Sequence, residues 1–301
     1  SFPTRRSSDL PVVLAGFDII GQAQTGTGKT LAFGAPILSR MEKSNGKVQA
    51  IIMSPTRELA VQVAEELSRI AKHERIKILP IYGGQSIDRQ ISALKRGVDI
   101  VVGTPGRLLD HIRKGSLKLA NAKFLVLDEA DEMLNMGFIE DIESIISNLS
   151  EDRQTLLFSA TMPRAIKILS KKYMHPETKI IAIEKKSLTV SKIKQYYYEV
   201  NQKNKFESLC RILDVDAPKT CILFCKTKKG VDELVDALQP RGYTVEGMHG
   251  DMKQSQRMNT LKKFKEGNLN FLIATDVAAR GIDVEEDRKS TRLNSSHKTH
   301  L

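Results

Sequence analysis

The chain of 301 residues contains no tryptophan, only 5% aromatic residues and only three cysteines. Cys210, Cys221 and Cys225 lack the paired spacing of a zinc site, and the last two flank an apolar Ile-Leu-Phe run. We therefore expect Cys221 and Cys225 to be buried strand residues in a reducing, cytoplasmic compartment, with a disulfide or a metal site as the less favoured alternative. No apolar run approaches the length that crosses a bilayer, so no membrane partner is expected.

The charge balance is basic, with a formal net charge of +11 and a pI near 9.5. A polyanionic partner would explain this excess, and so would a surface that is merely rich in lysine. Composition alone does not choose between them. With 41% hydrophobic residues the chain can bury a core, and its length fits one large domain or two ordinary ones.

Both ends of the chain differ from what lies between them. Residues 1–10 and 287–301 show no helical or strand periodicity, and both strings resemble translated short-read sequencing adapters. We expect them to be non-native tails, with disordered polar tails as the alternative. The natural part would then be residues 11–286, cut at both ends.

Between the tails, short apolar runs alternate with amphipathic segments, a pattern typical of a parallel α/β sheet. It predicts a first lobe over residues 11–183, a polar linker over 184–194 and a second, incomplete lobe over 195–286. The expected strands are 17–21, 50–54, 76–81, 99–103, 124–127, 155–159 and 179–183, then 195–200, 221–225, 244–248 and 270–274. The expected helices include 57–71, 138–149, 164–173, 205–213, 229–238 and 254–264.

A phosphate-binding pattern follows the first expected strand. Residues 23–30, Ala-Gln-Thr-Gly-Thr-Gly-Lys-Thr, fit a P-loop with alanine where the commonest form has glycine. Backbone N–H groups of this loop can surround phosphates, and a helix that starts near Gly28 points its positive end at them. Lys29 would reach the β- and γ-phosphates, and the Thr30 hydroxyl would ligate Mg²⁺. The expected nucleotide-binding residues are Gln24, Thr25, Gly26, Thr27, Gly28, Lys29 and Thr30.

An acidic pair follows a second apolar run, Lys-Phe-Leu-Val-Leu at 123–127. The run is typical of a buried parallel strand, and residues at the carboxyl end of such a strand face the nucleotide crevice. Asp128 is placed there as a carboxylate for Mg²⁺, and Glu129 is placed to polarise the attacking water. The two strings together predict an NTPase with Lys29, Asp128 and Glu129 as its catalytic residues.

Further short strings occur in a fixed order along the chain, and their joint spacing is much more specific than any one of them. They are Pro-Thr-Arg-Glu-Leu-Ala (55–60), Gly-Gly (83–84), Thr-Pro-Gly-Arg (104–107), Asp-Glu-Ala-Asp (128–131), Ser-Ala-Thr (159–161), Ile-Leu-Phe-Cys-Lys-Thr (222–227), His-Gly-Asp (249–251), Gln254 with Arg257, and Ala-Thr-Asp-Val-Ala-Ala-Arg-Gly-Ile-Asp (274–283). Through nearly all of residues 11–286 the chain resembles a DEAD-box ATP-dependent RNA helicase of superfamily 2. Residues 128–138 resemble the bacterial cold-shock-type members.

The resemblance implies an α/β fold of two RecA-like parallel-sheet lobes in tandem, the second truncated. It implies ATP and Mg²⁺ as cofactors, with single-stranded RNA bound between the lobes and short RNA duplexes melted locally as ATP is hydrolysed. Ribosome-assembly or RNA-decay partners would bind through a missing C-terminal region. A non-catalytic, ATP-dependent RNA-binding clamp and a DNA helicase of the same superfamily stay open as alternatives.

The resemblance also assigns roles to single residues. The implied RNA contacts are Pro55, Thr56, Arg57, Gly83, Gly84, Thr104, Arg107, Thr227, Gln254, Arg257 and Thr275. The coupling of nucleotide state to RNA affinity would depend on Asp131, Ser159, Thr161 and Arg280. Asp283 would contact the ATP ribose. Local alternatives remain, since Thr104 with Pro105 also fits an ordinary helix start, Gly83 with Gly84 an ordinary turn, and 159–161 a cap for the helix after Pro163.

Two parts of the family pattern are missing from this sequence. The adenine-recognising Q motif should place its glutamine close to position 6, where the chain has Arg6. The arginine-rich segment that would supply an arginine finger is absent, and such fingers contribute on the order of 10³–10⁵ in rate. We therefore expect this chain to hydrolyse ATP feebly at most and to fold poorly beyond the first lobe.

Overall fold

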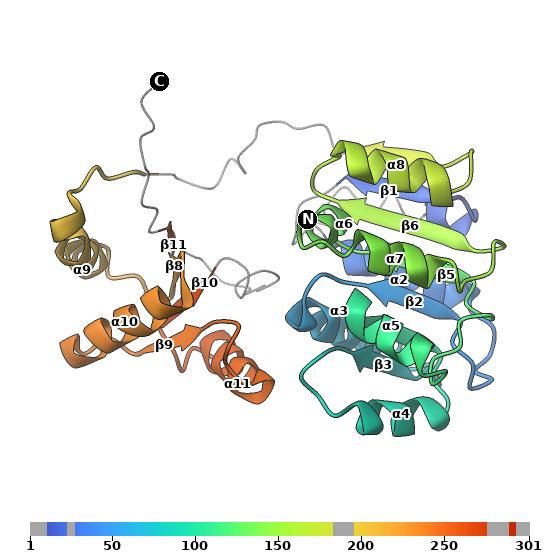
Figure 1. The fold of residues 1–301 in the computed structure, drawn as a ribbon, viewed down its shortest axis with the longest axis horizontal. Coiled ribbons are helices and arrows are strands. Elements are labelled where there is room, and N and C mark those ends of the chain that lie inside the picture. Colours follow the sequence, from blue (N-terminus) through green and yellow to red (C-terminus); the bar gives the residue numbers. More distant parts are fainter. Residues whose placement is uncertain (1–10, 23–27, 183–195, 276–288, 293–301) are drawn as a thin grey trace. The chain divides into compact units, whose positions relative to one another are not determined.

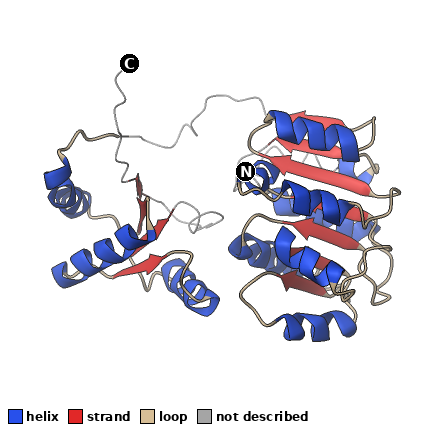
Figure 2. Cartoon of the chain, in the orientation of Figure 1, coloured by secondary structure: helices blue, strands red, loops and turns tan. Residues whose placement is uncertain are grey.

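The computed structural model describes residues 11–22, 28–182, 196–275 and 289–292. It divides into two compact units, residues 1–184 and 185–301, and each contains a parallel sheet with helices (Figures 1 and 2). The predicted linker and residues 1–10 lie outside the described residues. So do the site candidates Gln24, Thr25, Gly26, Thr27, Arg280 and Asp283.

The first unit is built on a seven-stranded parallel sheet in the order β3-β4-β2-β5-β6-β1-β7. Its strands are β1 (Ile19–Gln22), β2 (Ala50–Met53), β3 (Ile78–Ile81), β4 (Ile100–Gly103), β5 (Phe124–Leu127), β6 (Gln154–Ser159) and β7 (Lys179–Ala182). Its helices are α2 (Lys29–Arg40), α3 (Arg57–Ile70), α4 (Ile87–Lys95), α5 (Pro105–Arg113), α6 (Ala130–Asn135), α7 (Ile139–Ile146) and α8 (Arg164–Tyr173). All seven strands predicted for this lobe are confirmed, with ends displaced by no more than two residues.

Both faces of this sheet are buried, because alternate residues of each strand point to opposite sides. In β2, Ile51 and Met53 join one core together with residues of α5, α7 and α8, whereas Ala50 and Ile52 join the other with α2 and α3. Figure 1 shows α5, α7 and α8 in front of the sheet and α2 and α3 behind it. Burial on two faces explains why the strands are continuous apolar runs in the sequence.

The second unit is built on a four-stranded parallel sheet in the order β11-β8-β10-β9. Its strands are β8 (Cys221–Cys225), β9 (Val245–Met248), β10 (Phe271–Thr275) and β11 (Lys289–Arg292), and its helices are η1 (Gln202–Asn204), α9 (Lys205–Asp216), α10 (Lys228–Leu238), η2 (Gln239–Arg241) and α11 (Gln254–Lys265). All three cysteines are free and buried. Cys221 and Cys225 lie at the two ends of β8, as predicted for core strand residues, and Cys210 lies on α9. Burial raises the pKa of the Cys225 thiol to about 11.

Two features of the second unit differ from the sequence prediction. The strand expected at 195–200 is wrong in its described part, because residues 196–200 have no regular structure and Tyr196, Tyr197 and Tyr198 are exposed. A tyrosine run favours a strand only where a neighbouring strand and a packing face are present.

Conversely, β11 lies in a segment predicted as a tail, and it pairs in parallel with β8, with Lys289 opposite Cys221. Backbone pairing at a free sheet edge needs no particular side chains.

Candidate nucleotide and nucleic-acid sites

The site candidates of the first unit lie in the loops and helix starts that follow its parallel strands, at the carboxyl edge of the sheet. Loops after β1, β5 and β6, which are neighbours in the sheet, carry the phosphate, metal and coupling candidates. Loops after β2, β3 and β4, also neighbours, carry the RNA-contact candidates. The strand order therefore divides one edge of the sheet into two adjacent sites, at the place where α/β proteins bind their ligands.

Lys29 and Asp128 form a buried ion pair at this edge. Lys29 Nζ lies 3.3 Å from Asp128 Oδ1, and the two side chains are 8% and 4% exposed. Lys29 begins α2 directly after Gly28, whose φ of 79° lies in the left-handed region that glycine adopts without strain. The pair joins the P-loop helix to the end of β5, so the predicted phosphate and metal residues do meet.

Asp128 also has an oxygen suited to a divalent cation. Its Oδ1 is buried and accepts no hydrogen bond from any described residue, despite the nearby Lys29 charge. Mg²⁺ takes oxygen ligands and usually keeps several waters, binding through one or two protein groups plus substrate phosphates. Among the described residues there is no cluster of three or more His, Cys, Asp or Glu side chains that could hold a metal alone. Asp128 and the Thr30 hydroxyl therefore fit Mg²⁺ only when nucleotide phosphates supply further ligands to the ion.

Glu129 has an unusual backbone conformation. Its φ of 52° and ψ of 51° are left-handed, and it is the N-cap of α6. Within the described part of the chain only Ala217 shares a positive φ among non-glycine residues. Such conformations cost free energy and cluster at functional sites, where the surrounding structure maintains them. Glu129 follows Asp128 directly, in the turn between the end of β5 and the start of α6.

Asp131 is the centre of a hydrogen-bond network that links the loops after β5 and β6. Its Oδ2 accepts from the Thr161 backbone N–H at 2.8 Å and from the Thr161 hydroxyl at 2.7 Å. The Asp131 N–H donates to Ser159 Oγ at 3.3 Å, and that hydroxyl donates to the Thr161 carbonyl at 2.6 Å. Helix α8 has no side-chain cap at Pro163. These hydroxyls are therefore used between loops rather than as a helix cap.

The loops after β2 and β3 contact one another through Arg57 and Gly83. A Cβ at Gly83 would lie 3.2 Å from Arg57 Nη2, so the glycine leaves room for the guanidinium. Gly84 has a φ of 86°, which makes the loop a left-handed turn as well. Thr56, after the buried Pro55, is the N-cap of α3, and its hydroxyl accepts from the Leu59 N–H at 3.2 Å.

Thr104 and Arg107 follow β4. Thr104 is the N-cap of α5 with Pro105 in the first turn, as the ordinary-helix alternative predicts, but its hydroxyl makes no capping bond. Arg107 Nη1 donates to the Gln85 carbonyl at 3.1 Å and to Gln90 Oε1 at 3.2 Å. Sequence reasoning missed Gln90, because it lies within α4 and outside every recognised motif.

In the second unit the candidates again follow the carboxyl ends of parallel strands. Thr227, after β8, caps α10 by accepting from the Gly230 N–H at 3.0 Å. Gln254 and Arg257 lie buried on α11, which follows β9, and Thr275 ends β10. The structure thus brings these four residues to one edge of the second sheet.

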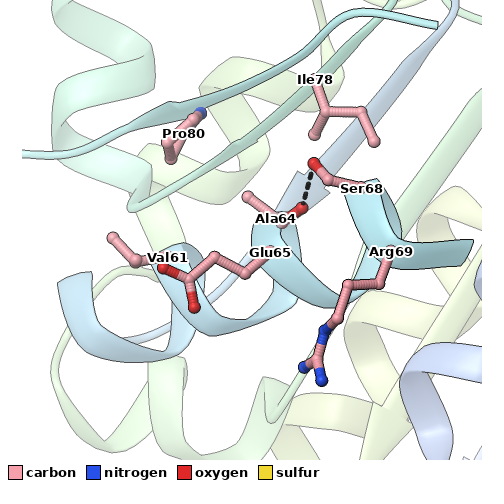
Figure 3. A pocket seen from close by; sticks show the side chains of 7 residues that line it. All are labelled: Val61, Ala64, Glu65, Ser68, Arg69, Ile78 and Pro80. Atoms are coloured by element: carbon pink, nitrogen blue, oxygen red, sulfur yellow. Dashed lines mark hydrogen bonds between the residues drawn. The ribbon is translucent and has the colours of Figure 1, made fainter. Parts of the chain in front are cut away.

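A hollow of about 460 Å³ lies elsewhere on the first unit, between α3 and the edge strand β3 (Figure 3). Its lining contains none of the predicted site residues. The lining residues are Val61, Ala64, Glu65, Ser68, Arg69, Ile78 and Pro80. The Ser68 hydroxyl in it donates to the Ala64 carbonyl at 2.7 Å, an ordinary intrahelical contact. We assign no chemistry to this hollow.

The fold and the edge motifs define a chain with two RecA-like lobes in tandem, the first carrying a P-loop helix and an acidic strand end. The model of the DEAD/DEAH box helicase family matches residues 7–169, and that of the helicase conserved C-terminal domain matches residues 204–288. The chain therefore belongs to the DEAD/DEAH box helicase family.

Known relatives agree with this assignment. The chain is 54% identical over 279 residues to the DEAD-box ATP-dependent RNA helicases CshA of Geobacillus kaustophilus and of Bacillus subtilis. The match covers 93% of this chain but only 60% and 56% of those relatives.

Solved structures show the same fold. A DEAD box protein from Methanococcus jannaschii matches at a TM-score of 0.56 with 47% identity, covering 92% of this chain and 74% of that one. S. cerevisiae Dbp5 bound to RNA and ADP BeF3 matches at 0.85 with 33% identity, covering 94% and 72%. None of the described helices is both long and apolar enough to span a membrane.

Proposed function

We propose that this chain is the core of an ATP-dependent RNA helicase, which binds single-stranded RNA with both lobes and unwinds short duplexes as ATP is hydrolysed. The observation that carries the proposal is the buried Lys29–Asp128 pair beside the Asp131–Thr161 network on one sheet edge. Family membership supports it, and so does the likeness to a Dbp5 structure that contains RNA and ADP BeF3.

In this proposal the residues at the ends of β1 and β5 act on the nucleotide. The Lys29 ammonium, released from Asp128, binds the terminal phosphates at the N-terminus of α2. Asp128 and Thr30 would hold Mg²⁺, which would supply neutralisation of the charge that develops on the phosphates. Glu129 orients the attacking water and accepts its proton.

RNA binds at the loops after β2, β3 and β4. Their hydroxyl, guanidinium and backbone N–H groups suit phosphates and 2′-hydroxyls, and they read no bases. The basic net charge adds a salt-dependent attraction that does not depend on sequence. The Asp131 network then couples the two sites, since it joins the loop that carries Asp128 to the end of β6.

We further infer that the 301-residue chain turns over ATP weakly, because the sequence contains no arginine-rich finger segment. The cytoplasmic location and the ribosome-assembly or RNA-decay partners expected from the sequence stay predictions. A non-catalytic, ATP-dependent RNA-binding clamp stays the alternative expected from the sequence.

The test compares the parent chain with Glu129→Gln and, as a control of equal charge change, Glu132→Gln on α6. ATP turnover is measured with and without single-stranded RNA, and RNA binding is measured by fluorescence anisotropy with nucleotide present. Glu129→Gln should abolish turnover and preserve nucleotide-dependent RNA binding, and Glu132→Gln should preserve both.

Equal loss of binding and turnover in Glu129→Gln would contradict the assigned role of this carboxylate. A parent chain that binds RNA with nucleotide but shows no turnover would favour the clamp. Stimulation by duplex DNA as strong as that by single-stranded RNA would favour a DNA helicase.

A further inference from the structure

Gln90 is a buried side chain that connects three parts of the first unit. It lies on α4, is 3% exposed, and its Nε2 donates to the Tyr82 carbonyl at 3.0 Å. Its Oε1 accepts from Arg107 Nη1 at 3.2 Å and lies 2.9 Å from His111 Nε2. One amide group therefore links the loop after β3 with helix α5, which follows β4.

The contacts fix the position of the Arg107 guanidinium. Its Nη1 also donates to the Gln85 carbonyl at 3.1 Å, and its Nε lies 3.5 Å from Asp110 Oδ2. An arginine side chain without such acceptors samples many rotamers, and ordering it costs entropy when a ligand binds. These contacts are made by Nη1 and Nε, so guanidinium donors remain for a phosphate.

The backbone segments at the ends of β3 and β4, next to Gln90, lie close together. A Cβ at Gly103, at the end of β4, would lie 2.4 Å from the Ile81 carbonyl at the end of β3. Tyr82 follows directly, and its carbonyl is the acceptor for Gln90. His111 is fully buried and occupies the remaining side of the Gln90 carbonyl, with its own Nδ1 2.9 Å from Ser116 Oγ. The amide is thus held from both ends.

We propose that Gln90 is a positioning residue for RNA binding: it holds Arg107 and the Gly83–Gly84 loop in the geometry that receives the RNA backbone. This inference rests on the proposed function, in which Arg107 contacts RNA. Gln90 is buried and touches no RNA itself, so its effect must pass through Arg107 and the loop after β3.

The test variant is Gln90→Met, which keeps the side-chain length and removes the hydrogen bonds. The chain offers a matched control in Gln154, a 6% exposed glutamine at the start of β6. Gln154 also accepts from an arginine, Arg40 Nη1 at 2.5 Å, and donates to the Val13 and Phe17 carbonyls. Its place at the beginning of β6 is the opposite edge of the sheet, so Gln154→Met removes the same chemistry away from the RNA loops.

Binding of a labelled single-stranded RNA is measured on the full 301-residue chain with nucleotide present. Gln90→Met should raise the Kd for RNA about tenfold, as expected for loss of hydrogen bonds to a charged group, and leave the Kd for nucleotide unchanged. Gln154→Met should change neither Kd. In an Arg107→Ala background, Gln90→Met should have little further effect, because both act through the same guanidinium. Equal weakening by Gln154→Met, or additive effects with Arg107→Ala, would overturn the proposal.

A second readout does not depend on RNA. The Nε–H resonance of Arg107 in ¹⁵N NMR spectra reports whether its guanidinium is fixed. Gln90→Met should shift this resonance toward that of a solvent-exposed, mobile arginine, and Gln154→Met should leave it unchanged. An Arg107 Nε–H resonance with the same position and line width in Gln90→Met as in the parent would overturn the positioning role. A parent chain that binds no RNA would instead remove the proposed function, and the NMR result would still decide whether Gln90 holds Arg107.

Discussion

Lys29 Nζ lies 3.3 Å from Asp128 Oδ1, and both side chains are more than nine-tenths buried. Strand β6 lies between the two strands that precede these residues, so the pair joins elements that are not adjacent in the sheet. The Lys29 ammonium neutralises the Asp128 carboxylate, whose Oδ1 accepts no hydrogen bond from any described residue. The same two groups would separate to receive phosphate and Mg²⁺.

Replacing Lys29 by methionine should destabilise the chain by roughly 3 kcal/mol, because it leaves a buried, unpaired carboxylate. It should also abolish nucleotide binding. Adding Asp128→Asn removes the stranded charge, so the double variant should regain most of its stability and still bind no nucleotide. Urea unfolding and titration with a fluorescent ATP analogue measure the two effects separately. A Lys29→Met variant as stable as the parent would show that the pair contributes nothing to the fold.

Removing the Thr161 hydroxyl should uncouple the two sites. Thr161→Val deletes the 2.7 Å bond to Asp131 and keeps the backbone bond, so nucleotide affinity should persist. RNA-stimulated ATP turnover should fall about tenfold, the loss expected for a hydrogen bond to a carboxylate.

The control for this variant is Thr155→Val on β6, the strand that precedes the Thr161 loop. The Thr155 hydroxyl is buried and has no hydrogen-bond partner in the described structure. Removing it should leave turnover unchanged and the chain as stable as before or more so. Equal loss of turnover in both variants would mean that any threonine hydroxyl removed from β6 or the loop after it has this effect, and it would contradict the coupling role of Thr161.

The sequence predicted the first sheet well, because burial on both faces makes each strand an apolar run bounded by polar residues. The position of the site candidates at one edge of the sheet was predictable too, since parallel strands such as β2 and β5 end at one edge. Gln90 was not, because a single glutamine within a helix gives no signal until α4 is packed beside α5. The tyrosine run at 196–198 was misread for the same reason: strand formation depends on a partner that local sequence does not contain.

Acid should destabilise the first unit through His111. Burial, and then the charge of Arg107, lower the pKa of His111 below its usual 6.5, with Lys114 acting in the same direction and Asp110 against it. Gln90 and Ser116 contact its two ring nitrogens. Below about pH 6.5 the unfolded chain therefore binds a proton that the folded chain does not. This contribution to stability is complete above pH 6.5 and is lost as the pH falls through the folded pKa.

His111→Gln removes the titrating group and keeps a polar side chain beside Gln90. Melting temperatures of the parent and the variant are compared between about pH 5 and pH 8, so that titrations common to both cancel. The parent should lose stability relative to the variant as the pH falls. A difference that stays constant across this range would show that His111 takes up its proton equally in both states.

Ala217 offers a stability gain away from the site. It ends α9 with a φ of 38° and ψ of 52°, a left-handed conformation that costs alanine about 1–2 kcal/mol and that glycine adopts freely. Glycine gains freedom in the unfolded chain as well, so Ala217→Gly should stabilise the second unit by only about 0.5–1 kcal/mol. Thermal unfolding of the chain measures the gain.

Glu129 is the matched case at the site, with a φ of 52°. Glu129→Gly relieves the same kind of strain but removes the carboxylate, so turnover should vanish whatever the change in stability. Ala217→Gly should leave turnover unchanged, and loss of turnover in both glycine variants would contradict the role given to the Glu129 carboxylate. We expect them to differ, because only the left-handed residue after Asp128 carries a group that the proposed reaction uses.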